Sequence, residues 1–567
     1  MRLLGLTFAV LSSFTLAYAQ EAQVVQRQAQ QARIGSSQPE AQKLTPEQRE
    51  RAMQLLEGAA AGARSLDSGS RSYALMQVAR VYQSIDKKKA IELLDEAITA
   101  AGEVARENDR LKRVGSELQE QVLKAMVPLA PEKAGEYVLQ LDGRGREQVL
   151  EALVDYYQQQ KKTDRALELV YRTGTEGEIP YGAASKIMET MTIEQASEKQ
   201  QLFTAALASY QDHDHADGGV SIGNGDFPDM IVRFSKGLPP ALVHQAIDVV
   251  LDSARKRAEK QSGDAQPMTI SIASAEGAVQ MNSLYQYRLF QLLPVLRTID
   301  PDEADKLLKE QTDVQTLLAK YPQGMNSVAP DRGDGAKGHP SNVSMMVSSG
   351  SGGGGGAPRG GGPRPGAMNP LEMQKAAKIA EDAEKHPQDA LANAASLQSD
   401  PVRLGAYMSI AQATWKKQPS VARQALSKAA DSIDKLEGDQ QLMQYSHLAR
   451  FYLRMGETDD AKKYIEKGMD AAGKIFKTDS NADDPNQAPK AYWPSVAGWK
   501  SLLSLGSEIS PLWAATLLKE IPDDEARTLA QLGIATTLLQ AEPSTTEIMT
   551  VTKNRNSMMI MGNDDHE

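Results

Sequence analysis

Apolar residues recur at helical spacing along most of the chain. Between residues 72 and 85 they include Tyr73, Met76, Val78, Ala79 and Tyr82, and between 88 and 104 they include Ala90, Leu93, Leu94, Ala97 and Ile98. This i, i+3, i+4, i+7 pattern places apolar side chains on one face of an amphipathic helix. Strand-like alternation is nearly absent, and its best example is the segment Met268–Ile272. The pattern predicts an all-α fold.

The helical pattern breaks between residues 323 and 370. This stretch contains 14 Gly and 6 Pro but no Leu, Ile, Phe, Trp or Tyr, so it cannot bury enough apolar surface to offset the entropy of ordering it. We expect a disordered linker between an N-terminal helical lobe (45–322) and a C-terminal one (371–545). Residues 20–44 are expected to form a disordered leader, and residues 546–567 a flexible tail.

The two predicted lobes share a repeated pattern. At an offset of 332 residues, seven positions of the first lobe match seven of the second without gaps. They are Arg71, Met76, Val78, Ala79, Ala90, Leu94 and Ala97, which match Arg403, Met408, Ile410, Ala411, Ala422, Leu426 and Ala429. Such self-similarity indicates stacked helical hairpins, each of which needs a neighbour to bury its apolar face.

One segment of the second lobe carries a more specific pattern of small and large residues. It consists of Tyr445, Leu448, Ala449, Tyr452, Gly456, Ala461, Ile465 and Gly468. The segment 445–472 resembles a tetratricopeptide repeat, and residues 150–170 and 71–98 match it less well. Gly473 stands where that family usually has its closing proline, so both a true tetratricopeptide repeat and a looser α-solenoid remain open.

The resemblance implies a scaffold whose concave face binds a peptide or a partner helix. In its best repeat, Tyr445 and Tyr452 are expected to pack between helices, whereas Arg450 is expected to be exposed and to contact a partner. The fold alone does not identify that partner.

Composition narrows the function classes. The chain carries 63 Lys and Arg against 74 Asp and Glu, a formal net charge of −11, so nucleic acid is not the expected partner. The absence of cysteine excludes disulfides, iron–sulfur clusters and cysteine nucleophiles. Aromatic residues make up 5% of the chain, which argues against a groove that stacks on sugars or bases.

The N-terminus has the pattern of a secretory signal peptide at residues 1–19. Arg2 precedes an apolar run from Leu3 to Leu16, and Ala17-Tyr18-Ala19 provides a small-x-small cleavage site. The alternative is a membrane anchor, but the run is shorter than the roughly 20 residues that span a bilayer. No later segment is predicted to cross a membrane, and we expect an exported protein, periplasmic or secreted, of bacterial type.

Two of the seven histidines lie close together, beside three carboxylates. The residues are Asp212, His213, Asp214, His215 and Asp217. Imidazole and carboxylate together suit zinc, manganese or nickel, so this segment is a candidate metal site. The glycines that follow it equally favour a solvated loop between helices.

No constellation of catalytic residues, such as a His-Glu-x-x-His helix, emerges from the sequence. His244 lies in an apolar helical segment and is expected to be a packed or surface histidine rather than a base. We expect a non-catalytic scaffold or adaptor with no cofactor and a protein or peptide partner. The alternatives are a metal-dependent helical enzyme, or a glycan-acting protein, that uses the 212–217 segment, and a purely structural spacer.

Overall fold

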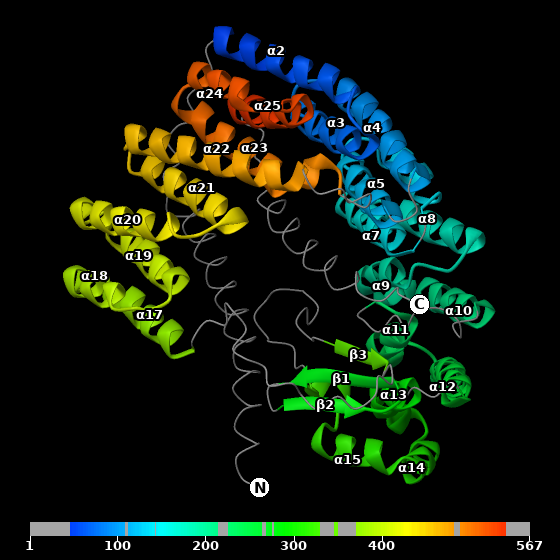
Figure 1. Cartoon of the computed structure of the whole chain (residues 1–567). Coiled ribbons are helices and arrows are strands. Elements are labelled where there is room, and N and C mark those ends of the chain that lie inside the picture. Colours follow the sequence, from blue (N-terminus) through cyan, green and yellow to red (C-terminus); the bar gives the residue numbers. More distant parts are fainter. Residues whose placement is uncertain are drawn as a thin grey trace. The chain divides into compact units, whose positions relative to one another are not determined.

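The structure, a computed structural model of the chain, is drawn in Figure 1. It describes residues 46–107, 111–141, 143–213, 225–263, 268–274, 277–328, 345–349, 370–480 and 488–539. The predicted signal peptide, leader and tail lie outside these residues, as does most of the predicted linker. The described residues are predominantly helical, which confirms the helical fold class.

The chain divides into two compact units, and this division differs from the predicted one. One unit, here called the hairpin unit, combines residues 43–137 with residues 358–567; the other, called the sheet unit, contains residues 138–357. The first five helices of the described residues therefore belong with the C-terminal helices rather than with their own predicted lobe. Composition marks where a linker lies, but it does not show which amphipathic faces pack together.

The hairpin unit is a stack of antiparallel helical pairs. Its C-terminal helices are α17 (Pro370–Asp382), α18 (Pro387–Ala395), α19 (Asp400–Thr414), α20 (Pro419–Ile433), α21 (Gly438–Arg454), α22 (Thr458–Ser480), α23 (Pro494–Ile509), α24 (Pro511–Leu517) and α25 (Asp524–Leu538), with short 3-10 turns at Lys490–Tyr492 and Leu518–Glu520. Its N-terminal helices are α2 (Pro46–Ala63), α3 (Ser68–Tyr82), α4 (Lys87–Glu107), α5 (Lys112–Met126) and α6 (Pro131–Val138), the last of which ends at the boundary of the unit.

One helical pair of this stack is built from opposite ends of the chain. Helix α25 packs along α2, as Figure 1 shows where the red and blue helices meet. The Gln531 amide donates to the carbonyl of Leu55 over 2.7 Å. Gly62 lets the helices approach closely, because a Cβ there would lie 3.0 Å from Thr528. The stack therefore continues from α25 into α2 and α3 without a covalent connection.

The same junction contains a buried pair of acids. Asp67 caps α3 by accepting from the amides of Gly69 and Ser70, and its carboxyl group also hydrogen-bonds to Glu525 in the first turn of α25. Burial and the neighbouring Asp67 raise the pKa of Glu525 to about 7, although the Lys490 ammonium, 3.4 Å away, opposes this shift. The pKa of Asp67 is lowered; burial opposes this, but hydrogen bonds from Glu525 and the amides outweigh it.

The internal repeat predicted from the sequence is confirmed for two hairpins. Helices α3 and α4 begin at Ser68 and Lys87, whereas α19 and α20 begin at Asp400 and Pro419. Both starts differ by the predicted 332 residues. The matched apolar positions from Val78 to Ala97 and from Ile410 to Ala429 are buried in both hairpins.

Charged pairs link helices of the hairpin unit, both within a hairpin, as between α3 and α4, and between hairpins, as between α20 and the start of α22. Examples are Arg64–Glu96, Arg71–Glu103, Arg423–Glu457, Lys467–Asp434 and Lys490–Asp523, with separations of 32 to 34 residues along the chain. Each such exposed or half-buried pair adds at most about 1 kcal/mol.

The sheet unit contains helices and one small sheet. The helices are α7 (Gly143–Gln159), α8 (Thr163–Glu176), α9 (Tyr181–Thr190), α10 (Ala196–Asp212), α11 (Phe227–Phe234), α12 (Pro240–Gly263), α13 (Leu284–Ile299), α14 (Pro301–Glu310), α15 (Thr312–Lys320) and α16 (Met325–Val328), with 3-10 turns at Ile193–Gln195 and Ser235–Gly237. The strands are β1 (Met268–Ser274), β2 (Gly277–Met281) and β3 (Met345–Ser349).

The segment Met268–Ile272, the best example of strand-like alternation in a chain expected to be all-α, lies in the central strand of an antiparallel sheet ordered β2-β1-β3. Ile270 pairs with Met281 on one side and with Val347 on the other. Ile270 and Ile272 are fully buried, so the sheet packs one face inward. Helix α16 and strand β3 fall within the predicted linker, and neither was foreseen because both are short.

Helix α13 packs against both α12 and α14 and thereby brings the start of α14 beside the start of α12. Its Leu289, Phe290, Leu292 and Leu293 side chains are fully buried. None of the helices in the described residues combines the length and the apolar character needed to cross a membrane.

Candidate functional site

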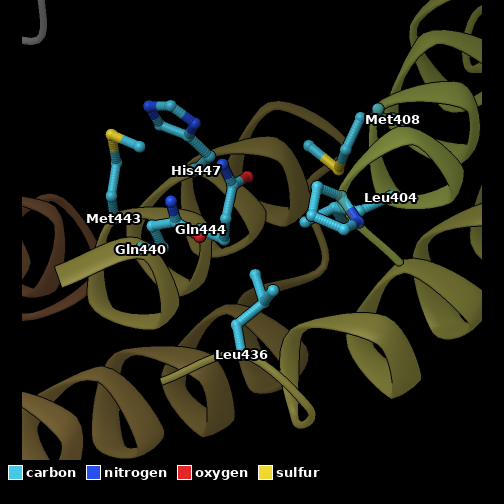
Figure 2. Close-up of a pocket in the computed structure, with 9 residues that line it drawn as sticks. Leu404, Met408, Leu436, Gln440, Met443, Gln444 and His447 are labelled. Carbon is cyan, nitrogen blue, oxygen red and sulfur yellow. The ribbon is translucent and has the colours of Figure 1, made fainter. Parts of the chain in front are cut away.

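A groove of about 290 Å³ lies between α19 and α21 in the hairpin unit, and Figure 2 shows its lining side chains. The lining residues are Pro401, Leu404, Gly405, Met408, Leu436, Gln440, Met443, Gln444 and His447. None of them is acidic or basic apart from the imidazole. The groove therefore offers apolar surface together with two neutral amide groups.

The local sequence explains this lining. Pro401 suits the first turn of α19, and the helix then presents Gly405 and Met408 to the groove. On α21, Gln440, Gln444 and His447 share one face, because they are separated by four and three residues. Met443 lies on the same face with 39% of its surface exposed, which is rare for a large apolar side chain in the described residues.

The three residues singled out in the best repeat behave as expected in packing terms. Tyr445 and Tyr452 are 5% and 4% exposed, and their rings stack on Tyr464 at centroid distances of 6.4 and 5.4 Å. Arg450 is exposed, one helical turn beyond His447. Burial raises the pKa of Glu508 in α23, and the positive charge of Arg450 only partly opposes this shift. The role of Arg450 in binding a partner stays a prediction.

A second hollow in the hairpin unit, of about 470 Å³, differs in chemistry. It is lined by Arg64, Arg71, Leu75, Asp95, Glu96, Thr99, Ala100 and Glu103. Its arginines already pair with Glu96 and Glu103 over 2.7 Å, and Asp95 pairs with Lys133. Because these charges neutralise one another, the neutral groove is the better candidate for binding a partner.

The predicted metal segment is only partly described. Asp212 is the last residue of α10 and is exposed, and the Nδ1–H of His213 donates to the Ser209 carbonyl over 2.8 Å. Asp214, His215 and Asp217 lie outside the described residues. The structure therefore describes only two of the five predicted ligands, and the site stays a prediction.

One further motif follows this segment. Gly219-Val220-Ser221-Ile222-Gly223 has the Gly-x-Ser-x-Gly spacing of the nucleophile elbow of α/β hydrolases. That elbow needs a strand before the serine and a helix after it. The pentapeptide lies outside the described residues, and the element that precedes it is the helix α10. The structure therefore describes no strand before Ser221, and the pentapeptide matches the nucleophile elbow in spacing alone.

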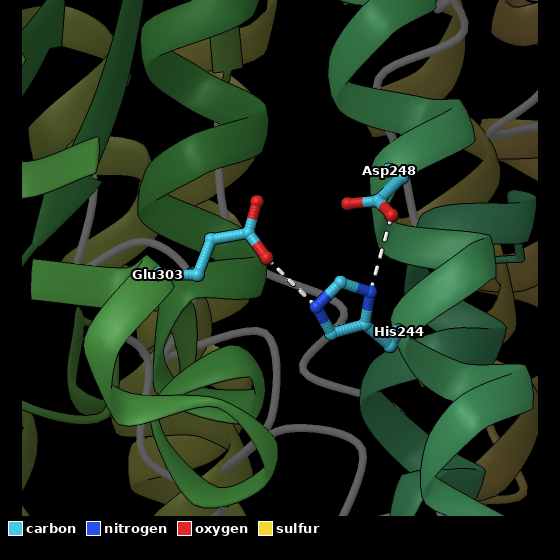
Figure 3. A group of neighbouring side chains, drawn as sticks. All are labelled: His244, Asp248 and Glu303. Carbon is cyan, nitrogen blue, oxygen red and sulfur yellow. Dashed lines mark hydrogen bonds and ion pairs between the residues drawn. The ribbon is translucent and has the colours of Figure 1, made fainter. Parts of the chain in front are cut away.

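A different cluster of polar side chains lies in the sheet unit (Figure 3). The His244 Nδ1 atom is 3.1 Å from Asp248 Oδ2, and its Nε2 atom is 2.7 Å from Glu303 Oε2. Asp300 Oδ2 lies 3.7 Å from the same Nε2 atom. The four residues come from two helices and the cap of α14, and about a quarter to a half of each side chain is exposed.

Electrostatics in this cluster favour the charged form of the imidazole. Burial lowers the pKa of His244, but the charge of Asp248 and the hydrogen bond to Glu303 outweigh it and raise the pKa overall. Burial raises the pKa of Asp248. His244 is thus a half-buried surface histidine, as the sequence indicated. Its i, i+4 spacing to Asp248 was the one available signal, because Asp300 and Glu303 are distant along the chain.

Comparisons with known proteins add little. No family model and no curated protein matches the chain. Among solved structures, the chain is similar to a protein described as a "circular tandem repeat protein with novel repeat topology and enhanced subunit contact surfaces", with 11% sequence identity over 90% of this chain and 98% of that chain. The TM-score of this comparison is 0.14, so the fold assignment rests on the helices of the chain itself.

Proposed function

We propose that this chain is an exported, non-catalytic scaffold that binds a protein partner through the groove between α19 and α21. The observation that carries the proposal is the neutral, methionine- and glutamine-lined groove on a stack of helical hairpins. Repeat stacks of this kind present extended surfaces for binding other proteins.

The chemistry of the groove indicates the kind of partner segment. Methionine side chains are flexible and polarisable, so Met408 and Met443 can adapt to several apolar side chains. The Gln440 and Gln444 amides can each donate to and accept from a peptide backbone. We therefore infer a short uncharged segment with one or two apolar side chains as the ligand. Arg450 continues the same face of α21 and suits an acidic residue flanking that segment.

Export is part of the proposal and depends on the predicted signal peptide. Its test is the N-terminal sequence and the cellular fraction of the mature protein, which should begin near Gln20. Finding the intact N-terminus in the cytoplasmic fraction would remove the envelope or secreted location from the proposal, while leaving the groove untouched.

Peptide selection tests the groove directly. A displayed random peptide library is selected on the mature chain, and the affinity of the selected peptides is measured by fluorescence anisotropy. Met443→Glu should weaken binding at least about tenfold, because it places an unpaired charge against apolar contacts. The matched control is Leu512→Glu, which makes the same change at an exposed position of α24 outside the groove. Equal binding by both variants would contradict the proposal.

A further inference from the structure

The cluster around His244 lies in the sheet unit, whereas the groove of the proposed scaffold lies in the hairpin unit. The two ring nitrogens of His244 have different surroundings. Nδ1 faces a single carboxylate, Asp248, from the next turn of its own helix. Nε2 faces two carboxylates, Asp300 and Glu303, from the start of α14. Figure 3 shows Asp248 and Glu303 at opposite nitrogens of the ring, and Asp300 lies on the Glu303 side.

This polarity matches the surroundings of histidines that bind metals. A metal-bound histidine donates its other ring N–H to a carboxylate or carbonyl, which fixes the tautomer and the orientation of the ring. Asp248 is placed to accept that proton at Nδ1 over 3.1 Å. A metal would replace the proton through which Nε2 contacts Glu303 in the structure, and Nε2 would then be a ligand on the side of Asp300 and Glu303.

The two separations from His244 Nε2 suit a small metal ion. Zinc–ligand bonds of about 2.0–2.1 Å in tetrahedral geometry place ligand atoms about 3.3 Å apart. The observed distances from His244 Nε2 are 2.7 Å to Glu303 and 3.7 Å to Asp300, which bracket that value. Small rotations of these half-exposed side chains would therefore be enough to make room for the ion.

Helix α14 fixes the position of both carboxylates. Asp300 is the N-cap of α14, and its Oδ1 atom accepts from the Glu303 amide over 3.0 Å. That bond leaves Oδ2 directed toward His244. Pro301 at the first helical position further restricts the backbone between the two acids. The two oxygen ligands are therefore held by the cap of a helix rather than by a loop.

Charge balance points the same way. In the described part of the chain, Asp248, Asp300 and Glu303 have no lysine or arginine within ion-pair distance, and His244 is their only basic neighbour. Three carboxylates around one imidazole leave at least two negative charges uncompensated. A divalent cation would neutralise them. An imidazole ligand with oxygen ligands favours zinc over calcium or magnesium, which prefer oxygen ligands alone.

We propose that His244, Asp300 and Glu303 bind a zinc ion that links α12 to α14, with Asp248 as the residue that orients the imidazole. At least one coordination position would face solvent, because three protein ligands do not complete a tetrahedron. The residues of this site differ from those of the 212–217 segment, which contains two histidines.

Calorimetric titration of the untagged mature chain with zinc chloride tests this proposal. We expect one site, with calcium and magnesium producing no comparable binding. His244→Ala should weaken zinc binding at least about 100-fold, and Glu303→Gln at least about tenfold. Asp248→Asn should weaken it about 10-fold to 100-fold, as substitution of an orienting partner does. Circular dichroism without metal shows whether each variant is folded, and Glu303→Gln preserves the shape of the side chain.

The matched control is the double variant His213→Ala/His215→Ala. It should retain the site, and X-ray absorption of the zinc-loaded chain should show one imidazole among oxygen ligands. Zinc binding that survives His244→Ala unchanged would overturn the proposal. So would its loss in the double variant alone, or the absence of any zinc binding by the folded chain.

Discussion

Two hairpins of the hairpin unit, α3–α4 and α19–α20, share one sequence pattern but differ in what covers them. Their helices begin 332 residues apart, and the equivalent residues Leu94 and Leu426 are both buried between the paired helices. The equivalent methionines differ. Met76 is fully buried, whereas Met408 lines the open groove.

The neighbouring position separates the two hairpins further. Tyr73 of α3 lies 5.8 Å from the ring of Tyr492 and accepts a hydrogen bond from Lys500 over 3.0 Å. Its equivalent, Gly405 of α19, is a lining residue of the groove, and a Cβ added there would meet no atom within 4 Å. The repeat pattern thus specifies the inside of a hairpin, while a few positions on its outer face decide whether that face is closed or open.

The largest expected effect on stability concerns the two equivalent methionines, Met76 and Met408. Met76→Glu should lower the free energy of unfolding by about 3–5 kcal/mol, because it buries a charge with no partner. Met408→Glu should cost less than about 1 kcal/mol, because its carboxylate can reach solvent through the groove, yet it should abolish peptide binding. Chemical denaturation of both variants measures the difference. Equal destabilisation would show that the face of α19 is also closed in solution.

The next effect should be the same in both hairpins. Leu94→Ala and Leu426→Ala each remove a buried side chain, and each should cost about 2–4 kcal/mol from lost transfer energy and the cavity left behind. All four tryptophans, Trp415, Trp493, Trp499 and Trp513, lie in the hairpin unit. Tryptophan fluorescence during urea unfolding therefore follows this unit, and clearly unequal costs would refute the equivalence of the two cores.

A third prediction concerns the pH dependence of stability that the buried acid pair beside α3 produces. The folded-state pKa of Glu525 is about 7, above its ordinary value of 4.5. The folded chain therefore keeps this proton where the unfolded chain has lost it, and stability should fall as pH rises from about 4.5 to 7. Glu525→Gln should remove this fall and stabilise the unit at pH 8 by about 1–3 kcal/mol.

The control for this prediction is Asp524→Asn, a similar change in the same turn at an exposed side chain paired with Arg527. Asp67 contributes in the opposite sense and only in acid, because its lowered pKa adds stability above about pH 3.8 that is lost below it. Thermal unfolding from pH 4.5 to 8 measures the effect. An unchanged pH profile in Glu525→Gln would show that the acid pair does not share a proton.

The smallest expected effect on stability concerns Gly405, on the groove face of α19. Gly405→Ala should stabilise the unit by about 0.5–1 kcal/mol, since glycine inside a helix costs that much relative to alanine and the new methyl group meets nothing. Gly533→Ala in α25 is the counterpart with the opposite sign, because its Cβ would lie 2.2 Å from the Lys500 carbonyl oxygen. Urea midpoints of the two variants should move in opposite directions, and a destabilising Gly405→Ala would mean that the face of α19 is covered.

Sequence patterns were sufficient for features that depend on neighbouring residues. Helical periodicity predicted the helices, the offset of 332 predicted two equivalent hairpins, and the alternation at Met268–Ile272 marked the place of β1 without deciding between a strand and an extended loop. The packing roles of Tyr445 and Tyr452 followed from the resemblance to a tetratricopeptide repeat. Each of these is set by which face of a single element is apolar.

Features that join distant residues could not be predicted in the same way. The pairing of α2 with α25 depends on Gly62 meeting Thr528, and neither residue indicates the other. His244 and Glu303 meet because α13 holds their helices together. The groove depends on how far apart two helices are held, which the composition of either helix does not specify.

The pairing of α2 with α25 also has a consequence for the order of synthesis. Leu55 and Gln531, which meet at this junction, are 476 residues apart along the chain. At roughly 5–20 residues per second, the ribosome completes α25 about 25–95 s after α2 has emerged. Throughout that interval α2, whose Ala52 and Leu56 are buried in the finished protein, lacks α25, the helix that packs along it. A nascent chain of this protein therefore depends on remaining unaggregated until its last helices are made, and any truncation before α25 makes that exposure permanent.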